Sequence, residues 1–278
     1  MDDRRDGSAA CPGLALSAGM TPANLAWRVE ETCLNAWPAL RQVFLDGWVL
    51  RFSGGLTRRA NSANPLRADY HRADALIPAC EALYRRQLLP TIFRLPSIID
   101  PDLDERLDAL GYGREGESCI LYGDIDAVAS ARDPEVQLSA HPTPEWFRAM
   151  GALQRQTTEQ SGIYRRIVGA IVIPAAFAAL AIDGEFVALA YGAVHNGLLC
   201  YESVITDPRR QRHGYARRVI ATLAAWAKDE GAWGACLQVE AGNAAALALY
   251  DAIGLKTRLY RYHYRREPGP ITPVVAKM

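Results

Sequence analysis

The chain has 278 residues, half of them apolar and 22% charged, which is the composition of an ordinary globular protein. Lys plus Arg and Asp plus Glu number 31 each, and this balance argues against a dedicated nucleic-acid-binding protein. No apolar run reaches the ~18 residues that a membrane helix needs, and the first residues lack the pattern of a secretory signal. The sequence therefore predicts a cytoplasmic protein that binds neither membranes nor nucleic acid.

The cysteines and histidines do not show the spacing of a metal site. The five histidines lack an H-x-x-x-H pair, and no C-x-x-C motif is present. Widely separated cysteines are typical of buried free thiols in a reducing compartment. We therefore expect no bound metal and no disulfide framework from the six cysteines, which are Cys11, Cys33, Cys80, Cys119, Cys200 and Cys236.

The N-terminal part combines a polar start with one clear helix and one clear strand. Residues 1–19 have the composition of a disordered arm, and Met20, just before Thr21-Pro22, is an alternative start of translation. A helix is expected over 21–37 and a strand over 48–52. The glycine turn that follows leads to polar residues that fit either a functional loop or a structural turn, namely Arg58, Arg59 and Asn61.

The C-terminal part predicts an α+β unit. Asp183-Gly184 and Asn196-Gly197 separate runs of apolar residues and are strong hairpin signals. The expected order is a helix at 144–160, a Tyr-Arg-Arg turn, strands at 176–182, 185–194 and 198–206, a loop at 207–214, a helix at 215–230, a strand at 234–240, a helix at 243–252 and a strand at 258–264.

The segment after the strand at 198–206 predicts an anion site. It reads Gln211-x-x-Gly214-x-Ala216 and runs directly into a helix, so free backbone N–H groups and the positive end of the helix dipole meet at one point. No Lys-Ser or Lys-Thr follows Gly214, which excludes a Walker loop, and a single glycine excludes a dinucleotide fingerprint. A phosphate or pyrophosphate group is the expected ligand.

This pattern resembles the pyrophosphate loop of the GNAT superfamily of acyl-CoA-dependent N-acyltransferases. A second segment is similar to the family pattern N-x-x-A-x-x-L-Y-x-x-x-G-[F/L] and lies in the right order, one helix and one strand downstream. The matching residues are Pro208, Gln211, Gly214 and Ala216 in the loop, and Asn243, Ala246, Leu249, Tyr250, Gly254 and Leu255 in the second segment. The resemblance implies the GNAT fold, a mixed and mostly antiparallel sheet flanked by helices.

The first half also resembles a GNAT unit, without the loop motif. Residues 104–112 are similar to 249–255, and both continue into a strand, at 118–122 in the first half. The stretch G-W-V-L-R-F-S-G-G-L-T-R-R-A-N-S resembles tandem-type bacterial GNAT proteins; an unrelated helix–strand cap is the alternative. The expected division is an arm at 1–19, a degenerate GNAT-like domain at 20–127, a linker at 128–141, a catalytic domain at 142–266 and a tail at 267–278.

The resemblance implies one acetyl-CoA site per chain. Backbone groups at Ile205 and Thr206 would pair with the pantetheine arm, and loop N–H groups would take the pyrophosphate. Unpaired N–H groups where the two central strands separate would polarise the thioester carbonyl, an effect worth ~3–4 kcal/mol per donor. The implied cofactor-binding residues are Ile205, Thr206, Gln211, Arg212, His213, Gly214, Tyr215, Ala216, Arg217, Asn243 and Tyr250, with Arg209 as a further phosphate contact.

The resemblance also implies a base for the amine and an acid for the thiolate. Glu202 is the leading base, on the same face as Val204 and Thr206 if the strand alternates regularly, or else a salt-bridged strand glutamate. Glu159, Glu240 and His195 are weaker candidates. Tyr250 stands at the family position that protonates the CoA thiolate, or else packs on the sheet.

Two functions are compatible with the sequence. The first is an N-acetyltransferase that moves an acetyl group from acetyl-CoA to a primary amine of a small molecule, amino acid or peptide, by direct attack and without a covalent enzyme intermediate. The second is a CoA-binding sensor with little turnover, favoured if Glu202 and Tyr250 do not share a cleft. The protein would be a monomer or homodimer.

Overall fold

The computed structural model describes residues 21–68 and 73–269. The expected arm at 1–19, Met20, and residues 270–278 of the expected tail lie outside this range. The strands are β1 (Arg41–Leu45), β2 (Trp48–Phe52), β3 (Ala63–Pro65), β4 (Ile92–Pro96), β5 (Gly113–Asp124), β6 (Val136–Ser139), β7 (Ala175–Ile182), β8 (Glu185–His195), β9 (Leu198–Thr206), β10 (Gly234–Glu240) and β11 (Thr257–Arg266). The helices are α1 (Pro22–Ala36), α2 (Ala73–Arg86), α3 (Asp102–Ala109), α4 (Ile125–Val128), α5 (Pro144–Leu153), α6 (Thr158–Gly169), α7 (Tyr215–Asp229) and α8 (Ala244–Ala252), with a short 3-10 turn at Pro208–Arg210.

The strands form one continuous sheet in the order β1-β2-β3-β4-β11-β5-β10-β9-β8-β7-β6. Only the pairs β3–β4 and β9–β10 are parallel. The predicted α+β class, with a mixed and mostly antiparallel sheet flanked by helices, is confirmed.

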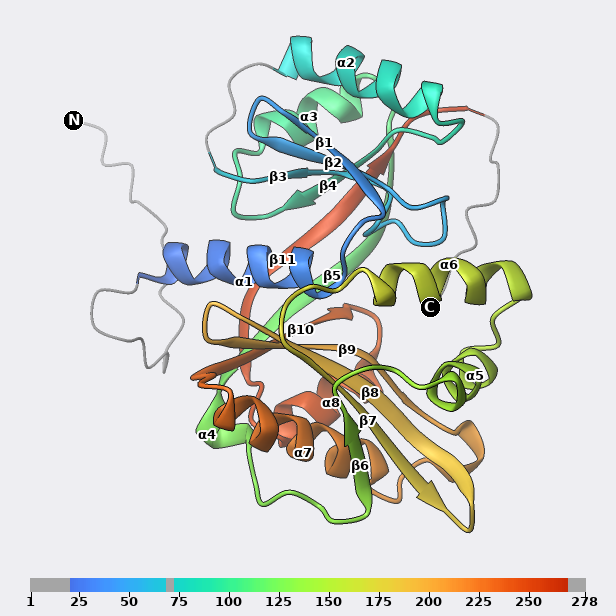
Figure 1. The fold of residues 1–278 in the computed structure, drawn as a ribbon. Helices are drawn as coiled ribbons and strands as arrows, with labels where there is room; N and C mark the ends of the chain where they lie inside the picture. Colours follow the sequence, from blue (N-terminus) through green and yellow to red (C-terminus); the bar gives the residue numbers. More distant parts are fainter. Residues whose placement is uncertain (1–20, 69–72, 270–278) are drawn as a thin grey trace, which may run out of the picture.

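The two parts of the chain interlock through their last strands. β5, from the first half, lies between β10 and β11, whereas β11, from the end of the chain, pairs with both β4 and β5. Figure 1 shows β5 and β11 as long strands that run from the upper layer, with α2 and α3, to the lower layer, with α7 and α8. Each half therefore contributes a strand to the other.

Two segments cross the domain boundaries expected from the sequence. α1, from the first half, packs on β8 and β9 of the second half. The expected linker at 128–141 contains β6, which pairs with β7 at the edge of the sheet. The expected division into domains stays a prediction, since these contacts describe packing and do not define domain boundaries.

Opposite faces of β9 carry different helices. Cys200 packs with Leu25, Val29 and Cys33 of α1, whereas its neighbours Leu199 and Tyr201 pack with α7. Because side chains alternate along a strand, α1 and α7 cover opposite faces of the central sheet. The apolar cores on these faces hold β9 and β10 in place, and the described helices include none long and apolar enough to cross a membrane.

Local signals explain most elements of the second half. The Asp183-Gly184 and Asn196-Gly197 turns have left-handed φ at both residues, as a two-residue hairpin turn requires, and the predicted hairpins are confirmed. The single helix expected at 144–160 is wrong. The chain ends α5 at Leu153, passes through Arg155 with φ 54°, and restarts at a capping box in which Thr157 and Gln160 bond reciprocally. The expected Tyr-Arg-Arg turn therefore lies within α6.

Candidate active site

The central feature of the site is the separation of β9 from β10. Their parallel pairing runs from Leu198 opposite Gly234 to Tyr201 opposite Leu237 and then stops. β9 continues to Thr206 on β8, and β10 continues to Glu240 on β5. Backbone groups of β9 beyond Tyr201 consequently face an opening rather than a neighbouring strand.

A β-bulge at Ser203 sets the direction of the side chains in this opening. Glu202 pairs with Tyr191 and Ile205 with Leu189, so Ser203 and Val204 together oppose one residue of β8. Ser203 has φ 54° and its hydroxyl lies 2.9 Å from that of Tyr164. The expected common face of Glu202 with Val204 and Thr206 is wrong. Because of the bulge, Glu202 shares its face with Ile205.

Glu202 is buried and held by an arginine from the first half of the chain. The Nη1 and Nη2 atoms of Arg59 donate to its two carboxylate oxygens at 2.6 and 2.9 Å. Glu202 is 4% exposed, and the Arg59 guanidinium also lies over the Trp37 ring at 5.1 Å. The two hydrogen bonds from Arg59 therefore fix the orientation and the position of the Glu202 carboxylate.

The same contacts set the proton affinity of Glu202. Burial raises the pKa of Glu202 above its ordinary value, because the charged form loses hydration, although Arg59 opposes the rise. The ion pair keeps the carboxylate charged in a site where burial alone would favour the neutral acid. A carboxylate of this kind accepts a proton more readily than an exposed glutamate.

Tyr250 reaches the cleft from α8. Its side chain is 8% exposed, and its hydroxyl makes no hydrogen bond to any residue in the described part of the chain. Burial, together with the charge of Glu202, raises the pKa of Tyr250 to about 12. The phenol is therefore protonated at neutral pH. It can donate its proton to a ligand without first breaking a hydrogen bond to a described residue.

One cavity of about 530 Å³ brings these groups together. Glu202, Tyr250, Asn243 and Ile205 all line it, so the expected acid and base share a cleft. The other wall includes Trp37, Arg58 and Arg59 from the first half, and Tyr262, Tyr264 and Arg266 from β11. Asn243 is also the N-cap of α8, where its side chain accepts from the Ala246 N–H at 3.0 Å.

The predicted anion loop follows directly from β9. Gly214 has φ 78° and is the N-cap of α7, and Arg218 N–H makes the first helical bond to its carbonyl. The N–H groups of Tyr215, Ala216 and Arg217 therefore precede that bond and point out of the helix end. No heavy atom lies within 4 Å of a Cβ built at Gly214, so the position is open to a ligand. Gln211, Arg212 and His213 are exposed beside it, with the His213 ring stacked on Tyr215.

The arginines of this loop are not equivalent. Arg209 pairs with the buried Asp207 at 2.7 Å, although its own side chain is 83% exposed, and Arg218 pairs with Asp133 at 2.6 Å. A phosphate contact by Arg209 stays a prediction. Arg217 donates to the Ala252 carbonyl at 3.2 Å and borders a separate cavity of about 850 Å³ beside α7. Arg212 makes no ion pair with any residue that the structure describes.

The weaker candidates for the base lie in other settings. His195 is at the far end of β8 and contacts Glu31 at 2.9 Å, and Glu159 is exposed on α6; neither lines the cleft. Glu240 lines the cleft but is exposed at the end of β10. Thr206, an expected cofactor residue, pairs with Ala188 of β8 and lies just beyond the cleft lining.

Three cysteines that are distant in sequence converge beneath α1. The sulfur atoms of Cys33, Cys200 and Cys236 are buried and lie within 4.8 Å of one another, the one group of possible metal ligands found among the described residues. Residues from α1, β9 and β10 approach only through tertiary packing, so spacing along the chain could not reveal the group. All five cysteines in the described ranges are free thiols.

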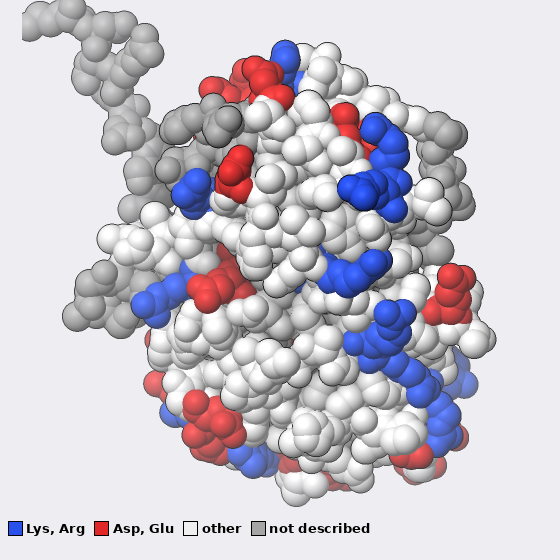
Figure 2. Space-filling model, turned by 45° about the horizontal axis from the view of Figure 1, so that its top comes forward, with Lys and Arg blue, Asp and Glu red and all other residues white. Residues whose placement is uncertain are grey.

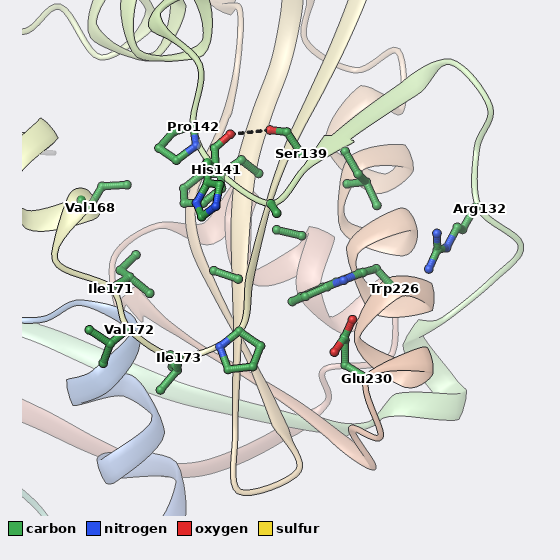
Figure 3. A pocket seen from close by; sticks show the side chains of 17 residues that line it. Arg132, Ser139, His141, Pro142, Val168, Ile171, Val172, Ile173, Trp226 and Glu230 are labelled. Atoms are coloured by element: carbon green, nitrogen blue, oxygen red, sulfur yellow. Dashed lines mark hydrogen bonds between the residues drawn. The ribbon is translucent and has the colours of Figure 1, made fainter.

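A larger cavity, of about 630 Å³, carries none of the expected site residues. Figure 3 shows it between the end of α7, with Trp226 and the C-cap Glu230, and the segment from Val168 to Ile173. Ser139 and His141 close one side, where the Ser139 hydroxyl donates to the His141 carbonyl at 2.8 Å. Apolar side chains predominate there, so the cleft at Glu202 is the candidate active site.

Sequence reasoning missed two features of the cleft. Trp37 was expected only to end a helix, yet its ring supports Arg59, and its Nε1 lies 3.2 Å from the Thr57 hydroxyl. The Ser203 bulge was also missed, because a positive φ is uncommon at serine. The glycine-flanked pair Arg58-Arg59 was the one available signal; both side chains line the cleft, whereas Asn61 does not.

Comparison with known proteins identifies the family. Residues 27–265 match the family model described as probable histone acetyltransferase Rv0428c C-terminal. The chain belongs to this family. It is thus a GNAT N-acetyltransferase, as the loop and Tyr250 motifs predict.

Relatives and solved structures agree with this assignment. The acetyltransferase is 26% identical over 242 residues to the uncharacterized N-acetyltransferase YobR of Bacillus subtilis (strain 168), covering 86% of this chain and 97% of that protein. It is 32% identical over 120 residues to the probable histone acetyltransferase Rv0428c of Mycobacterium tuberculosis (strain ATCC 25618 / H37Rv), covering 43% of this chain and 36% of that protein.

Two structures share the fold of this acetyltransferase. A GCN5-related N-acetyltransferase from Kribbella flavida superposes with a TM-score of 0.66 at 16% identity, over 91% of this chain and 98% of that one. A tandem GNAT protein from the clavulanic acid biosynthesis pathway superposes with a TM-score of 0.62 at 12% identity, over 92% and 90%. The tandem architecture predicted from the first half is therefore also found among the structural neighbours.

Proposed function

We propose that this acetyltransferase moves an acetyl group from acetyl-CoA to a primary amine by direct attack. The observation that carries the proposal is the shared cleft, in which Glu202 and Tyr250 line the point where β9 leaves β10. A CoA sensor would need neither an acid nor a base there. The exposed N–H groups at the start of α7 are the proposed pyrophosphate site, with Gln211, Arg212, His213 and Arg217 beside it.

Glu202 is the proposed base. A lysine-like amine is almost fully protonated at neutral pH, a handicap of about 4.6 kcal/mol, so loss of its proton must accompany attack. The Glu202 carboxylate, oriented by Arg59, would take this proton directly or through one water. The amine nitrogen then bonds to the acetyl carbon, and backbone N–H groups of β9 beyond Tyr201 would stabilise the oxyanion.

Tyr250 is the proposed acid. As the carbon–sulfur bond breaks, its hydroxyl would give its proton to the departing thiolate, and the acetylated amine and CoA leave. A phenol with a pKa of about 12 stays protonated until that moment. The Tyr250 position on α8 and its free hydroxyl both support this role, and no covalent enzyme intermediate is needed.

The first test separates binding from turnover. Acetyl-CoA, and not a generic polyanion, is expected to raise the melting temperature. A panel of amines is then expected to accelerate release of the CoA thiol. Stabilisation without amine-dependent release would favour the sensor function instead. A cytoplasmic location is proposed on the free state of the described cysteines, and a monomer or homodimer stays a prediction.

A further inference from the structure

The cleft contains an arginine, Arg58, that the acetyl transfer described above does not use. It comes from the loop at 53–61, which is tightly bound together. The Asn61 side chain accepts from the N–H groups of Ser53 at 2.7 Å and Gly55 at 2.9 Å, and donates to the Thr57 carbonyl at 2.7 Å. Asn61 is 3% exposed. The backbone that carries Arg58 is therefore fixed.

β5 is shaped around the Arg58 guanidinium. Between Glu115 and Glu117 the strand bulges at Gly116, which has φ 56°. A Cβ built at Gly116 would lie 2.7 Å from Nη2 of Arg58. The guanidinium also lies over the Tyr264 ring at 4.8 Å. The glycine bulge and the aromatic ring both contact the guanidinium at the wall of the cleft.

The charge of Arg58 is only partly compensated. Arg58 approaches Glu115 at 3.5 Å, but Arg266 holds the same carboxylate at 2.8 Å. Two guanidinium groups thus share one carboxylate, while Arg59 is fully used by Glu202. The remaining acid of the cleft, Glu240, is exposed, so water screens its charge.

The arginine side chains Arg58 and Arg266 are more exposed than Glu202. The Arg58 side chain is 27% exposed and that of Arg266 21%, whereas Glu202 is nearly sealed. Figure 2 shows basic side chains gathered on the right-hand side of the face that it draws. A purely cationic acceptor entering the cleft would meet two guanidinium groups that share one carboxylate, that of Glu115.

We propose that the acceptor carries a carboxylate beside its amine, and that Arg58 binds this carboxylate while the amine faces Glu202. This rests on the proposed acetyl transfer and specifies its substrate class as amino acids or similar small amino carboxylates. The planar fork of Arg58 suits a carboxylate, and Arg266 is the second donor within the same charge cluster. Arg58 is then a specificity-determining residue and takes no part in proton transfer.

The test compares matched acceptors that differ only in the carboxylate. Phenylalanine is compared with phenethylamine and lysine with cadaverine, and a lysine-rich peptide is added, with CoA release as the readout. We expect kcat/KM to be at least about tenfold higher for each amino acid than for its decarboxylated partner, as one charge-assisted hydrogen bond implies. Arg58→Gln should remove this preference, so that kcat/KM for each amino acid falls to about that of its decarboxylated partner.

Two further variants keep the test decisive. Arg261→Gln removes the same charge from β11, where Arg261 pairs with Glu117 at 3.0 Å outside the cleft, and should leave the preference intact. Gly116→Ala should displace the guanidinium and weaken the preference even if Arg58→Gln folds poorly.

The outcomes distinguish this inference from the proposed function. Equal use of both members of each pair, or a preference for the lysine-rich peptide, would overturn the carboxylate site and leave acetyl transfer standing. If acetyl-CoA binds and no acceptor releases CoA, the proposed function fails and this inference fails with it.

Discussion

At the scale of single residues, the chemistry depends on groups whose surroundings are unusual for their type. Tyr250 is buried with a free hydroxyl, and Glu202 is a buried carboxylate whose two oxygens are both bound by Arg59. The loop motif and the Tyr250 segment were recognisable in the sequence because each lies within one short stretch. The partner of Glu202 was not, because Arg59 is 143 positions away.

Removal of the Tyr250 hydroxyl should slow catalysis without harming the fold. Tyr250→Phe is expected to lower kcat about 100-fold, the usual scale for a lost proton donor, because the thiolate must leave without a proton from the enzyme. Stability should hold, since the hydroxyl makes no hydrogen bond to the described residues. Steady-state CoA release and a melting curve check the two halves of this prediction.

Tyr122 offers a matched control. Its hydroxyl is also buried without a partner, and burial raises its pKa to about 12 as well, but it lies outside the cleft. Tyr122→Phe should leave kcat unchanged. An equal loss of activity in both variants would show that the Tyr250 effect is structural.

The pH dependence should report Glu202. A base must be ionised, so kcat should fall as the pH drops through the Glu202 pKa, which burial holds above the ordinary glutamate range. Glu202→Gln should lower kcat and remove this acidic limb. A pH profile with an acceptor amine of low pKa checks the prediction, and an acidic limb that persists in Glu202→Gln would assign it to another group.

At the scale of elements, a glycine stands at each end of α7. Substitutions at the two glycines distinguish an effect on stability from an effect on ligand binding. Gly214 begins the helix with φ 78° and Gly231 follows its end with φ 83°, and in both cases no heavy atom would contact a Cβ. Substitution by alanine should therefore cost a similar 1–2 kcal/mol or so at either end, from backbone strain alone.

Only one of these substitutions should affect acetyl-CoA. Gly214→Ala places a methyl group where the pyrophosphate is proposed to bind and should raise the Kd for acetyl-CoA about tenfold, whereas Gly231→Ala should not. Calorimetric titration of both variants measures this directly. Equal affinities would exclude the start of α7 as the phosphate site.

The loop at 53–61 joins the halves through the Arg59–Glu202 pair. Arg59→Gln leaves a buried carboxylate without its partner and should lower the free energy of unfolding by about 3 kcal/mol. Adding Glu202→Gln should recover much of this loss, because the uncompensated charge is gone. Denaturant unfolding of the single and double variants measures the coupling free energy between Arg59 and Glu202. Strictly additive losses of stability would contradict the predicted ion pair.

Elements with local signals were predicted well, and those that depend on distant contacts were not. The Asp-Gly and Asn-Gly hairpins follow from two residues each. The restart of the chain as α6 depends on Thr157, which reads as an interior residue of one long helix until its capping box is seen. Ser203, at the bulge, is hydrogen-bonded to Tyr164 of α6, 39 positions away.

At the scale of the whole molecule, the exchange of β5 and β11 joins the two halves in one continuous sheet. The tandem organisation could be inferred from the similarity of 104–112 to 249–255. The strand exchange could not, because pairing between β4 and β11 joins residues more than 150 positions apart. The complete chain should consequently unfold in a single cooperative transition, by calorimetry and by fluorescence together.

The fragment 142–266, the expected catalytic domain, tests the same point from the other side. It lacks β5, which fills the space between β10 and β11, and α1, which covers β8 and β9. We expect it not to fold alone, whereas two separate transitions or a stable fragment would show that the halves are independent.

The most direct measurement of the central claim is detection of the transferred acetyl group. The full-length protein is incubated with isotope-labelled acetyl-CoA and an amino-carboxylate acceptor, and the products are examined by mass spectrometry. We predict a labelled N-acetyl product that forms at the rate of CoA release, much more slowly in Tyr250→Phe and at the normal rate in Tyr122→Phe. Binding of acetyl-CoA with no labelled amide from any amine, or equal product from both tyrosine variants, would contradict the account.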